Sequence, residues 1–348
     1  MNQIESMPVA GKQIRTPVFI VGSPRSGTTL LRVTLNRHPL LAVCGETNYF
    51  RRLYGRRQAF GDPGNLQNRT RIVDAYLAIE KVRGLGMDIG QLRERLIMEG
   101  ASWRAIFATL LQTYADLNGK PLAGEKTPSH ALHIDTLCEW FPGCSIIHLV
   151  RDPRATVCSL TKVPWATRSA LIGAYTWRSF NASASAASHR DNYIRVKYEE
   201  LVARPDEQIH RICNHVGLDY DETMLQPNPA EVDPRDWVRR AFEEITPSRT
   251  AVWQSDFQSW QVAAIETTAG EYMEEFGYER QTSGAAGSSM LRAGLEAFVE
   301  LGFQTLFRSP YFFYRYFRPT NLADEQKWFA RASAMYGRVR LPRAAGVP

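Results

Sequence analysis

The residues most suited to chemistry lie in a short turn that follows an apolar run. The stretch Phe19–Arg32 reads FIVGSPRSGTTLLR, with small and hydroxyl residues around one arginine. In such a turn consecutive backbone N–H groups point into one concavity, and the following helix adds the positive end of its dipole. Gly27 permits close backbone approach to an anion, and Arg25 supplies a guanidinium fork that fits tetrahedral oxyanions. The additional hydroxyl donors are Ser26, Thr28 and Thr29.

This predicted anion loop departs from the ordinary nucleotide-binding loop at one position. Gly22 and Gly27 have the separation of the G-x-x-x-x-G-K-[ST] pattern, but Thr28 stands where the lysine would be. That lysine normally reaches the terminal phosphates, while Mg²⁺ sits on the neighbouring hydroxyl. Its absence argues against an ordinary ATPase or kinase. It favours a differently charged group that is held without metal.

Strands and helices must position these residues. The apolar run Thr16–Gly22 is typical of a buried parallel strand, and three leucines place a stripe on a helix from Thr28 to about Arg37. A second strand is expected at Cys144–Pro153, with a helix that starts near Pro153. A third strand is expected at Tyr193–Leu201 and leads into a helix.

Further patterns complete the outline of the fold. The turn-rich, basic stretch Arg51–Thr70 predicts an exposed loop or lid. The other helical patterns cover roughly Met87–Met98, Ser102–Leu117, Ser129–Phe141, Ala166–Arg190, Asp206–His215 and Asp256–Phe276. This alternation predicts an α/β protein with a three-layer P-loop-like fold, in which helices flank a central, mainly parallel sheet.

Composition narrows the class of partner. The chain has 348 residues, of which 44% are hydrophobic and 22% charged, with a formal net charge of +6. The mild positive excess suits an anionic small ligand, an acidic partner or a membrane surface. Nucleic acid is disfavoured because no long run of lysine and arginine occurs.

The cysteines and the N-terminus indicate the compartment. Five scattered cysteines contain no C-x-x-C pair, so neither a zinc site nor a disulfide framework is expected. The N-terminus has no apolar signal region, and no run of 18 or more uncharged apolar residues occurs. We therefore expect a cytoplasmic protein, with possible contact to the inner face of a membrane.

Two motifs together resemble the sulfotransferases that use 3′-phosphoadenosine 5′-phosphosulfate (PAPS). GSPRSGTTLLRVTLNRHP, at Gly22–Pro39, resembles their 5′-phosphosulfate loop, and IIHLVRDPRATVCSL, at Ile146–Leu160, resembles their 3′-phosphate motif. The resemblance covers roughly Thr16–Arg280 and is strongest to tyrosylprotein and related bacterial sulfotransferases. It implies PAPS as co-substrate, adenosine 3′,5′-bisphosphate as product and no metal.

The resemblance implies roles for individual residues. The loop residues Arg25, Ser26, Gly27, Thr28 and Thr29 would cradle the sulfate and the 5′-phosphate. Arg151 and Ser159 would bind the 3′-phosphate, and Tyr198, in VKYEEL, would line the nucleotide. Lys126, in GEKTP, would approach the transferred sulfate from a turn. Glu46, in CGET, would act as general base.

The chemistry of sulfuryl transfer agrees with these roles. The reaction needs in-line positioning and charge stabilisation, with little covalent work from the protein. PAPS presents less negative charge at its transferred group than ATP, so Arg25, Lys126 and the helix N-terminus could replace Mg²⁺. A carboxylate that takes the acceptor proton contributes about 10²–10⁴-fold. Glu46 follows Arg25 by one helix and a short return, and Glu125 is the alternative base.

The predicted 3′-phosphate site departs from the family pattern. Relatives often carry an arginine at the position of Val163, which here has Lys162 beside it. A basic residue often precedes the tryptophan that matches Trp253, whereas Val252 stands here. The candidates to compensate are Arg239, Arg240 and Arg249.

The acceptor side is less defined. We expect Asn48–Arg57, which includes Tyr49 and Phe50, and Val163–Arg168 to touch the acceptor. A sulfotransferase domain at 1–280 is expected, followed by a small-residue flexible linker at 281–289 and an aromatic, basic helical extension at 290–348. The extension could lie on a membrane, but packing on the core or homodimerisation is favoured.

These observations predict a PAPS-dependent sulfotransferase with Glu46 as base. Its acceptor would be a hydroxyl, or less readily an amine, of a small molecule, carbohydrate or lipid. One alternative is a P-loop kinase that phosphorylates a small metabolite with ATP and Mg²⁺. The other is a non-catalytic nucleotide-binding module.

Overall fold

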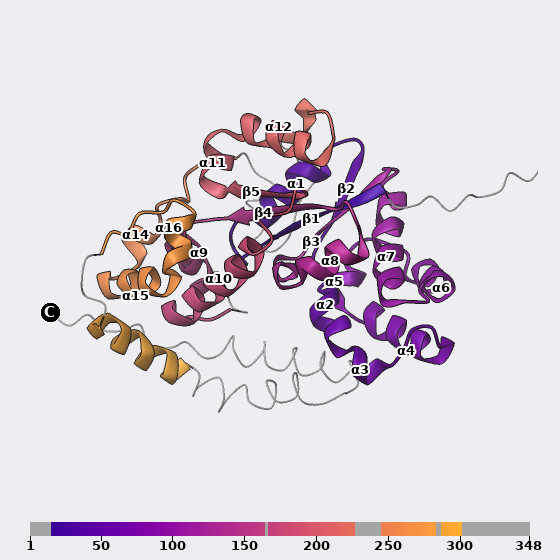
Figure 1. The fold of residues 1–348 in the computed structure, drawn as a ribbon, viewed down its shortest axis with the longest axis horizontal. Helices are drawn as coiled ribbons and strands as arrows, with labels where there is room; N and C mark the ends of the chain where they lie inside the picture. The colour runs from indigo at the N-terminus through magenta and orange to yellow at the C-terminus, as the bar shows by residue number, and fades with distance from the viewer. Residues whose placement is uncertain (1–14, 164–165, 227–244, 283–286, 301–348) are drawn as a thin grey trace, which may run out of the picture. The chain divides into compact units, whose positions relative to one another are not determined.

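Five parallel strands form the centre of the fold, with helices on both faces (Figure 1). The computed structural model describes residues 15–163, 166–226, 245–282 and 287–300. The strands are β1 (Arg15–Gly22), β2 (Leu41–Cys44), β3 (Leu122–Lys126), β4 (Ser145–Val150) and β5 (Tyr193–Lys197). Their order in the sheet is β2-β3-β1-β4-β5, and every neighbouring pair is parallel. The predicted α/β fold with a central parallel sheet is confirmed.

Helices connect the strands and cover the sheet. Those before β3 are α1 (Thr28–Asn36), α2 (Tyr49–Arg52), the 3₁₀ helix η1 (Tyr54–Arg56), α3 (Arg57–Phe60), α4 (Leu66–Leu77), α5 (Glu80–Arg83), α6 (Ile89–Glu99) and α7 (Trp103–Leu117). Those after β3 are η2 (Pro128–His133), α8 (Ile134–Trp140), α9 (Pro153–Thr161), α10 (Ala170–Ser185), α11 (Tyr198–Ala203), α12 (Pro205–Val216), η3 (Glu222–Leu225), α14 (Trp253–Asp256), α15 (Ser259–Ala269) and α16 (Glu271–Glu275). Residues 287–300 form a further helix.

Strand β1 is buried on both faces. Val18 and Ile20 pack in one apolar cluster with residues of α1 and α12, whereas Phe19 and Val21 pack in another with residues of α7 and α8. Figure 1 shows α1, α11 and α12 on one side of the sheet and α7 and α8 on the other. Side chains alternate along a strand, so a strand covered on both faces reads as a continuous apolar run.

Several predicted helix ends are confirmed by their caps. The Ser102 hydroxyl accepts a 3.1 Å hydrogen bond from the Ala105 N–H and starts α7. Pro153 is the first residue of α9, after the cap Asp152. Helix α12 ends at Gly217, whose φ of 75° lies in the left-handed region that glycine adopts readily.

The sequence patterns did not indicate β2 or β3, which are four and five residues long. Strand β3 reads LAGEK, and its polar end masks the strand signal. A Cβ atom on Gly124 would lie 3.0 Å from the Val18 carbonyl oxygen, so a side chain there would crowd β1. The expected turn at Lys126 is wrong, because Lys126 is the last residue of this strand.

The segment Arg51–Thr70 is exposed at half of its residues, as expected, but the expectation of a loop is wrong. The segment is largely helical, in α2, η1, α3 and the start of α4. Tyr49 and Phe50, expected near the acceptor, are fully buried core residues. The Tyr49 ring stacks on Phe107 with centroids 4.6 Å apart, and Phe50 stacks on His133 at 4.6 Å. Aromatic packing therefore orders a segment that is polar in sequence.

A single helix expected at Asp256–Phe276 is divided into α14, α15 and α16. Gly270, with φ of 57°, separates the last two. No helix in the described ranges is long and apolar enough to cross a membrane. The predicted linker and extension fall partly outside the described residues.

Candidate active site

The carboxyl ends of all five strands lie at one edge of the sheet, and each carries polar groups there. Taken across the sheet from β2 to β5, these groups are Glu46 after β2, Lys126 in β3, the anion loop Gly22–Thr29 from the end of β1 into the first turn of α1, Arg151 after β4 and Tyr198 after β5. The chain builds β2 and β3 on one side of β1 and β4 and β5 on the other. Ligands of open α/β sheets bind where the strand order reverses in this way.

The anion loop has an unusual backbone. Arg25 has φ of 71° and Gly27 has φ of 99°, both in the left-handed region. Ser26 closes the loop, because its N–H and its hydroxyl donate to the Ser23 carbonyl at 3.2 and 2.7 Å. A direct contact of the Ser26 hydroxyl with an anion stays a prediction. Thr28 is buried at the start of α1, and Thr29 follows it.

Lys126 joins the loop to the carboxylate after β2. Its ammonium donates to Thr29 Oγ1 at 3.3 Å and to Glu46 Oε1 at 2.9 Å. The register of the sheet explains this meeting, because Ile20 of β1 pairs with Lys126 of β3, and β3 pairs with β2 on its other side. Lys81, from α5, contacts the other oxygen of Glu46.

Charge and burial compete at this cluster. Burial opposes ionisation of the Glu46 carboxyl, but Lys126 and Lys81 outweigh it and hold the pKa well below its usual range. Burial lowers the pKa of Lys126, and Glu46 offsets part of that effect. Glu46 is therefore ionised, and the two ammonium groups lower its basicity.

Arg25, in the loop, and Arg151, after β4, place two positive charges close together. Arg25 Nε donates to Ser159 Oγ at 3.1 Å, and Arg151 Nη1 donates to the Arg25 carbonyl at 3.3 Å. Burial, followed by repulsion from Arg151, lowers the pKa of Arg25. Mutual repulsion of this kind is relieved by a bound anion, so the site suits a ligand with several negative charges.

Tyr198 packs between the loop and Arg151. A Cβ atom on Gly27 would lie 2.4 Å from the Tyr198 ring, so the loop needs a glycine there. The Arg151 guanidinium lies over the Tyr198 ring, 4.4 Å from its centroid. The Tyr198 ring therefore lies close to both Gly27 of the loop and the Arg151 guanidinium.

The positions that depart from the family pattern are only partly described. Arg239 and Arg240 lie outside the described residues. Arg249 uses its carbonyl oxygen to accept a 2.6 Å hydrogen bond from Arg151 Nη2. Lys162 forms an exposed ion pair with Asp256, and Val163 is buried.

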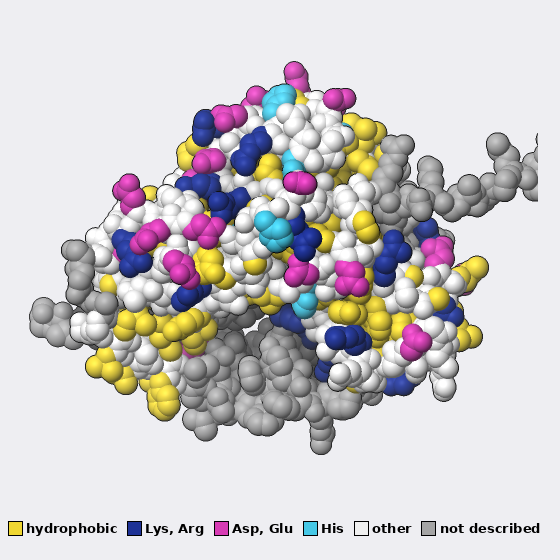
Figure 2. Space-filling view, in the orientation of Figure 1, with side chains coloured by type: hydrophobic (Ala, Val, Ile, Leu, Met, Phe, Trp, Pro, Cys, Tyr) yellow, Lys and Arg dark blue, Asp and Glu magenta, His cyan; other side chains and the backbone are white. Residues whose placement is uncertain are grey.

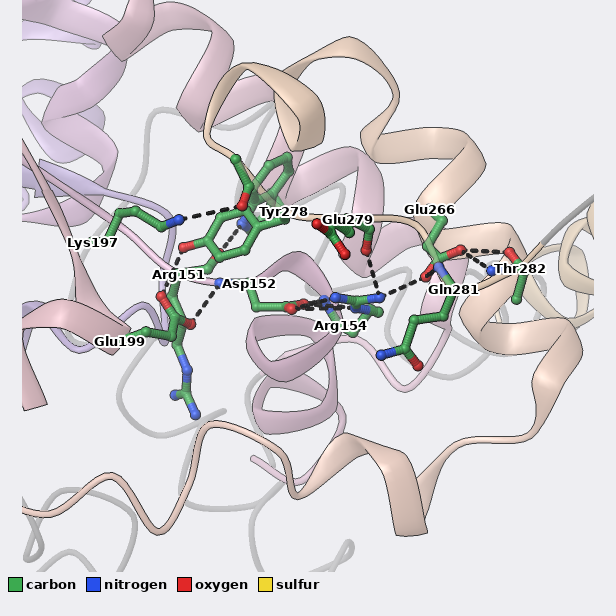
Figure 3. A network of polar contacts seen from close by, with 12 residues as sticks. Arg151, Asp152, Arg154, Lys197, Glu199, Glu266, Tyr278, Glu279, Gln281 and Thr282 are labelled. Atoms are coloured by element: carbon green, nitrogen blue, oxygen red, sulfur yellow. Dashed lines mark hydrogen bonds and ion pairs between the residues drawn. The ribbon is translucent and has the colours of Figure 1, made fainter. Parts of the chain in front are cut away.

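A polar network beside the site escaped the sequence analysis (Figure 3). Buried Arg154 pairs with Asp152 and Glu266, each at 2.7 Å, and donates to the Glu279 carbonyl at 3.1 Å. Glu199 accepts from the Asp152 N–H at 3.0 Å and from the Tyr278 hydroxyl at 2.8 Å. The network fixes the start of α9, which follows Arg151, against the segment after α16. Its members are far apart in sequence, so no local pattern indicates it.

Glu125, the alternative base, has a different environment. It is fully buried and accepts from the Thr47 N–H and hydroxyl at 3.1 and 3.0 Å. Its second oxygen lies 3.0 Å from His130 Nδ1. Glu125 therefore anchors the turn that carries Glu46.

The second expected acceptor segment, Val163–Arg168, includes the undescribed residues 164–165. Its end contacts the helix at 287–300, because Glu300 accepts from the Thr167 hydroxyl at 2.9 Å and the Arg168 N–H at 3.0 Å. The same helix exposes large hydrophobic side chains, and Figure 2 shows hydrophobic side chains gathered in this part of the surface. Its exposed large hydrophobic residues are Leu291, Leu295, Phe298 and Val299.

A parallel sheet whose first strand ends in an arginine-bearing loop at a helix N-terminus defines an α/β fold of the P-loop-like class. The family model described as the sulfotransferase family matches residues 17–222, more than half of the chain. This chain belongs to the sulfotransferase family and is an enzyme. In the part of the chain that the structure describes, no group of three or more His, Cys, Asp or Glu side chains could hold a metal ion.

Individual relatives agree with this assignment. A Caenorhabditis briggsae protein assigned as a protein-tyrosine sulfotransferase is 24% identical over 280 residues, which cover 76% of this chain and 90% of that protein. The omega-hydroxy-beta-dihydromenaquinone-9 sulfotransferase of Mycobacterium tuberculosis is 23% identical over 231 residues, 62% of this chain and 53% of that protein. The solved sulfotransferase domain of the Synechococcus PCC 7002 olefin synthase has a TM-score of 0.57 and 26% identity, covering 78% of this chain and 98% of that domain.

Proposed function

We propose that this enzyme transfers the sulfuryl group of PAPS to a hydroxyl group, or less readily an amine, of a small-molecule, carbohydrate or lipid acceptor. The observation that carries the proposal is the position of Lys126, whose ammonium lies 3.3 Å from Thr29 Oγ1 and 2.9 Å from Glu46 Oε1. One cation thus joins the anion loop, where the donor would bind, to the carboxylate that would take the acceptor proton.

The donor would occupy the loop and the positive groups beside it. The loop residues Arg25, Ser26, Gly27, Thr28 and Thr29 would hold the sulfate and 5′-phosphate. Arg151 and Ser159 would hold the 3′-phosphate, and Tyr198 would line the nucleotide. The repulsion between Arg25 and Arg151 supports a polyanionic ligand such as PAPS.

In the proposed reaction the acceptor oxygen attacks sulfur in line with the bond to the 5′-phosphate. The new S–O bond forms as the bond to the phosphate oxygen breaks, and the acceptor proton passes to Glu46. Lys126 and Arg25 neutralise charge that develops on the departing oxygen. General-base catalysis typically contributes about 10²–10⁴-fold, and Glu46 would reach this range once a lysine moves away and its basicity rises.

The acceptor is the least constrained part of the proposal. The named acceptors of the relatives range from protein tyrosine to a hydroxylated dihydromenaquinone.

A cytoplasmic location also stays a prediction. We further propose that the extension, which begins with the exposed apolar side chains of the helix at 287–300, packs on the core or forms a homodimer. Analytical ultracentrifugation of Leu295→Glu tests this, and liposome flotation of the wild type identifies a membrane instead.

Ligand binding and transfer can be tested separately. Adenosine 3′,5′-bisphosphate should raise the melting temperature more than ATP with Mg²⁺, because a ligand that binds the native state stabilises it. Glu46→Gln should retain this response but lose transfer from labelled PAPS by about 10²-fold or more. Glu80→Gln, an exposed carboxylate on α5, is the matched control. A response to ATP with Mg²⁺ alone would favour the kinase, and undiminished transfer by Glu46→Gln would exclude Glu46 as base.

A further inference from the structure

Glu46 is held by two lysines that differ in their access to solvent. Lys126 contacts Oε1, and its side chain is 5% exposed. Lys81 contacts Oε2, and its side chain is 47% exposed, whereas that of Glu46 is 27% exposed. The buried lysine lies on the side of the anion loop, and the solvent-facing lysine lies on the other carboxylate oxygen.

The fold fixes Lys81 beside the carboxylate. Val82, the next residue of α5, is fully buried in the core beside β2 and α7. Leu85 follows α5 and packs against the turn that carries Glu46, since a Cβ atom on Gly45 would lie 3.6 Å from its methyl carbon. Lys81 therefore reaches Glu46 from an anchored segment.

The two contacts leave the carboxylate without an oxygen that is free of an ammonium group. Each carboxylate oxygen can accept more than one hydrogen bond, but an ammonium group lowers the basicity of the oxygen that it contacts, so a hydroxyl finds a better base when one lysine gives up its place. Lys126 is buried and is also bonded to Thr29, whereas Lys81 faces solvent and can move aside at little cost. The acceptor would therefore reach Oε2.

We propose that Lys81 is a positioning residue for the general base: it orients Glu46 with Oε2 toward the acceptor and yields that oxygen to the incoming hydroxyl. This inference rests on the proposed function of the same site. It adds a residue that lies 35 positions from Glu46 in sequence and outside both family motifs.

The charges that face Glu46 come from three elements. Lys126 lies on β3, Lys81 on α5 and Arg25 in the anion loop. Burial raises the pKa of the carboxyl, and the two lysines lower it further than burial raises it. Removal of the Lys81 charge should therefore move the Glu46 pKa upward.

Lys81→Met, Lys81→Arg and the control Arg83→Met test the proposal. Arg83 is an exposed cation on the same short helix, so its loss matches the change in net charge. Two readouts are needed: the pH dependence of kcat/KM, and the ¹³C NMR titration of the Glu46 carboxyl, assigned with Glu46→Gln. Lys81→Met should move the carboxyl titration and the acid limb of kcat/KM to higher pH. Lys81→Arg should restore both, and Arg83→Met should match the wild type.

The affinity for adenosine 3′,5′-bisphosphate should stay the same in Lys81→Met, because Lys81 contacts Glu46, whereas Lys126 makes the contact with Thr29 of the anion loop. An unshifted Glu46 titration, or an unshifted acid limb, would overturn the role of Lys81. If the wild type binds the nucleotide but sulfates no acceptor, the proposed function fails on its own. The NMR titration still decides whether Lys81 controls Glu46.

Discussion

Arg25 and Ser159 meet across the site, although 134 positions separate them in sequence. Arg25 Nε donates to Ser159 Oγ at 3.1 Å, which links the loop after β1 to helix α9 after β4. The serine thereby orients the guanidinium of Arg25, a residue whose backbone has a left-handed conformation. This contact joins the two regions that the sequence assigns to the 5′ and 3′ ends of the donor.

Ser159→Ala should weaken the binding of adenosine 3′,5′-bisphosphate. Loss of a hydrogen bond to a charged group costs about 1.5–3 kcal/mol, so the dissociation constant should rise by at least about tenfold. Isothermal titration calorimetry measures the change. Thr161→Val, on the same helix, removes only a local bond to the Cys158 carbonyl and should bind like the wild type. Equal affinities for Ser159→Ala and Thr161→Val would contradict the prediction.

Gly27→Ala should destabilise the fold through two separable effects. Left-handed backbone costs a residue with a side chain about 1–2 kcal/mol, and the new methyl group would also collide with Tyr198. Gly86→Ala is the control, because Gly86 has φ of 81° but open space around its Cβ position. Urea denaturation should show a larger loss for Gly27→Ala, and Tyr198→Ala should relieve the excess. A loss no greater than that of Gly86→Ala would argue against the contact.

Arg154→Met should reduce stability strongly. The change leaves Glu266, which is almost fully buried, without its charged partner, and breaking a buried ion pair typically costs about 3–5 kcal/mol. Arg204→Met breaks an exposed pair with Glu207 and should cost at most about 1 kcal/mol. Chemical unfolding followed by circular dichroism compares the two. Similar losses would mean that the network in Figure 3 is not a stabilising element.

Buried His148 should make stability depend on pH. Burial lowers its pKa from 6.5 to about 4, while the unfolded chain keeps the ordinary value. As pH falls from 6.5 to 4 the unfolded chain binds a proton that the folded protein does not, so the free energy of unfolding should fall. His148→Gln should have a shallower slope over this range in urea titrations at several pH values. Parallel slopes would contradict the assignment.

The parts of the fold that the sequence predicted are those with continuous local patterns. The run before Gly22 and the run before Asp152 are apolar on both faces, and each ends in a turn that starts a helix. Strands β2 and β3 are short, and β3 ends in Glu125 and Lys126, so polar residues interrupt the pattern. The same polar end brings Lys126 into the site.

The residues of the candidate site also divide into those that lie in local sequence motifs and those that do not. Arg25 and Arg151 lie in recognisable motifs, so their neighbourhood could be predicted. Lys81 and Arg154 act through partners that are distant in sequence, such as Glu46 and Glu266. These contacts depend on how the helices pack in three dimensions, and the spacing of residues along the sequence does not indicate that packing.

The strand order has a consequence for how this enzyme could change. Arg151 and Tyr198 stand on one flank of β1, while Glu46, Lys81 and Lys126 stand on the other. Nearly all of the chain between β2 and β3 folds on the latter flank as an aromatic-lined subassembly. Substitutions in the segment between β2 and β3 could therefore change which acceptor binds. The strands on the other side of β1, which are assigned to the nucleotide, would not need to change.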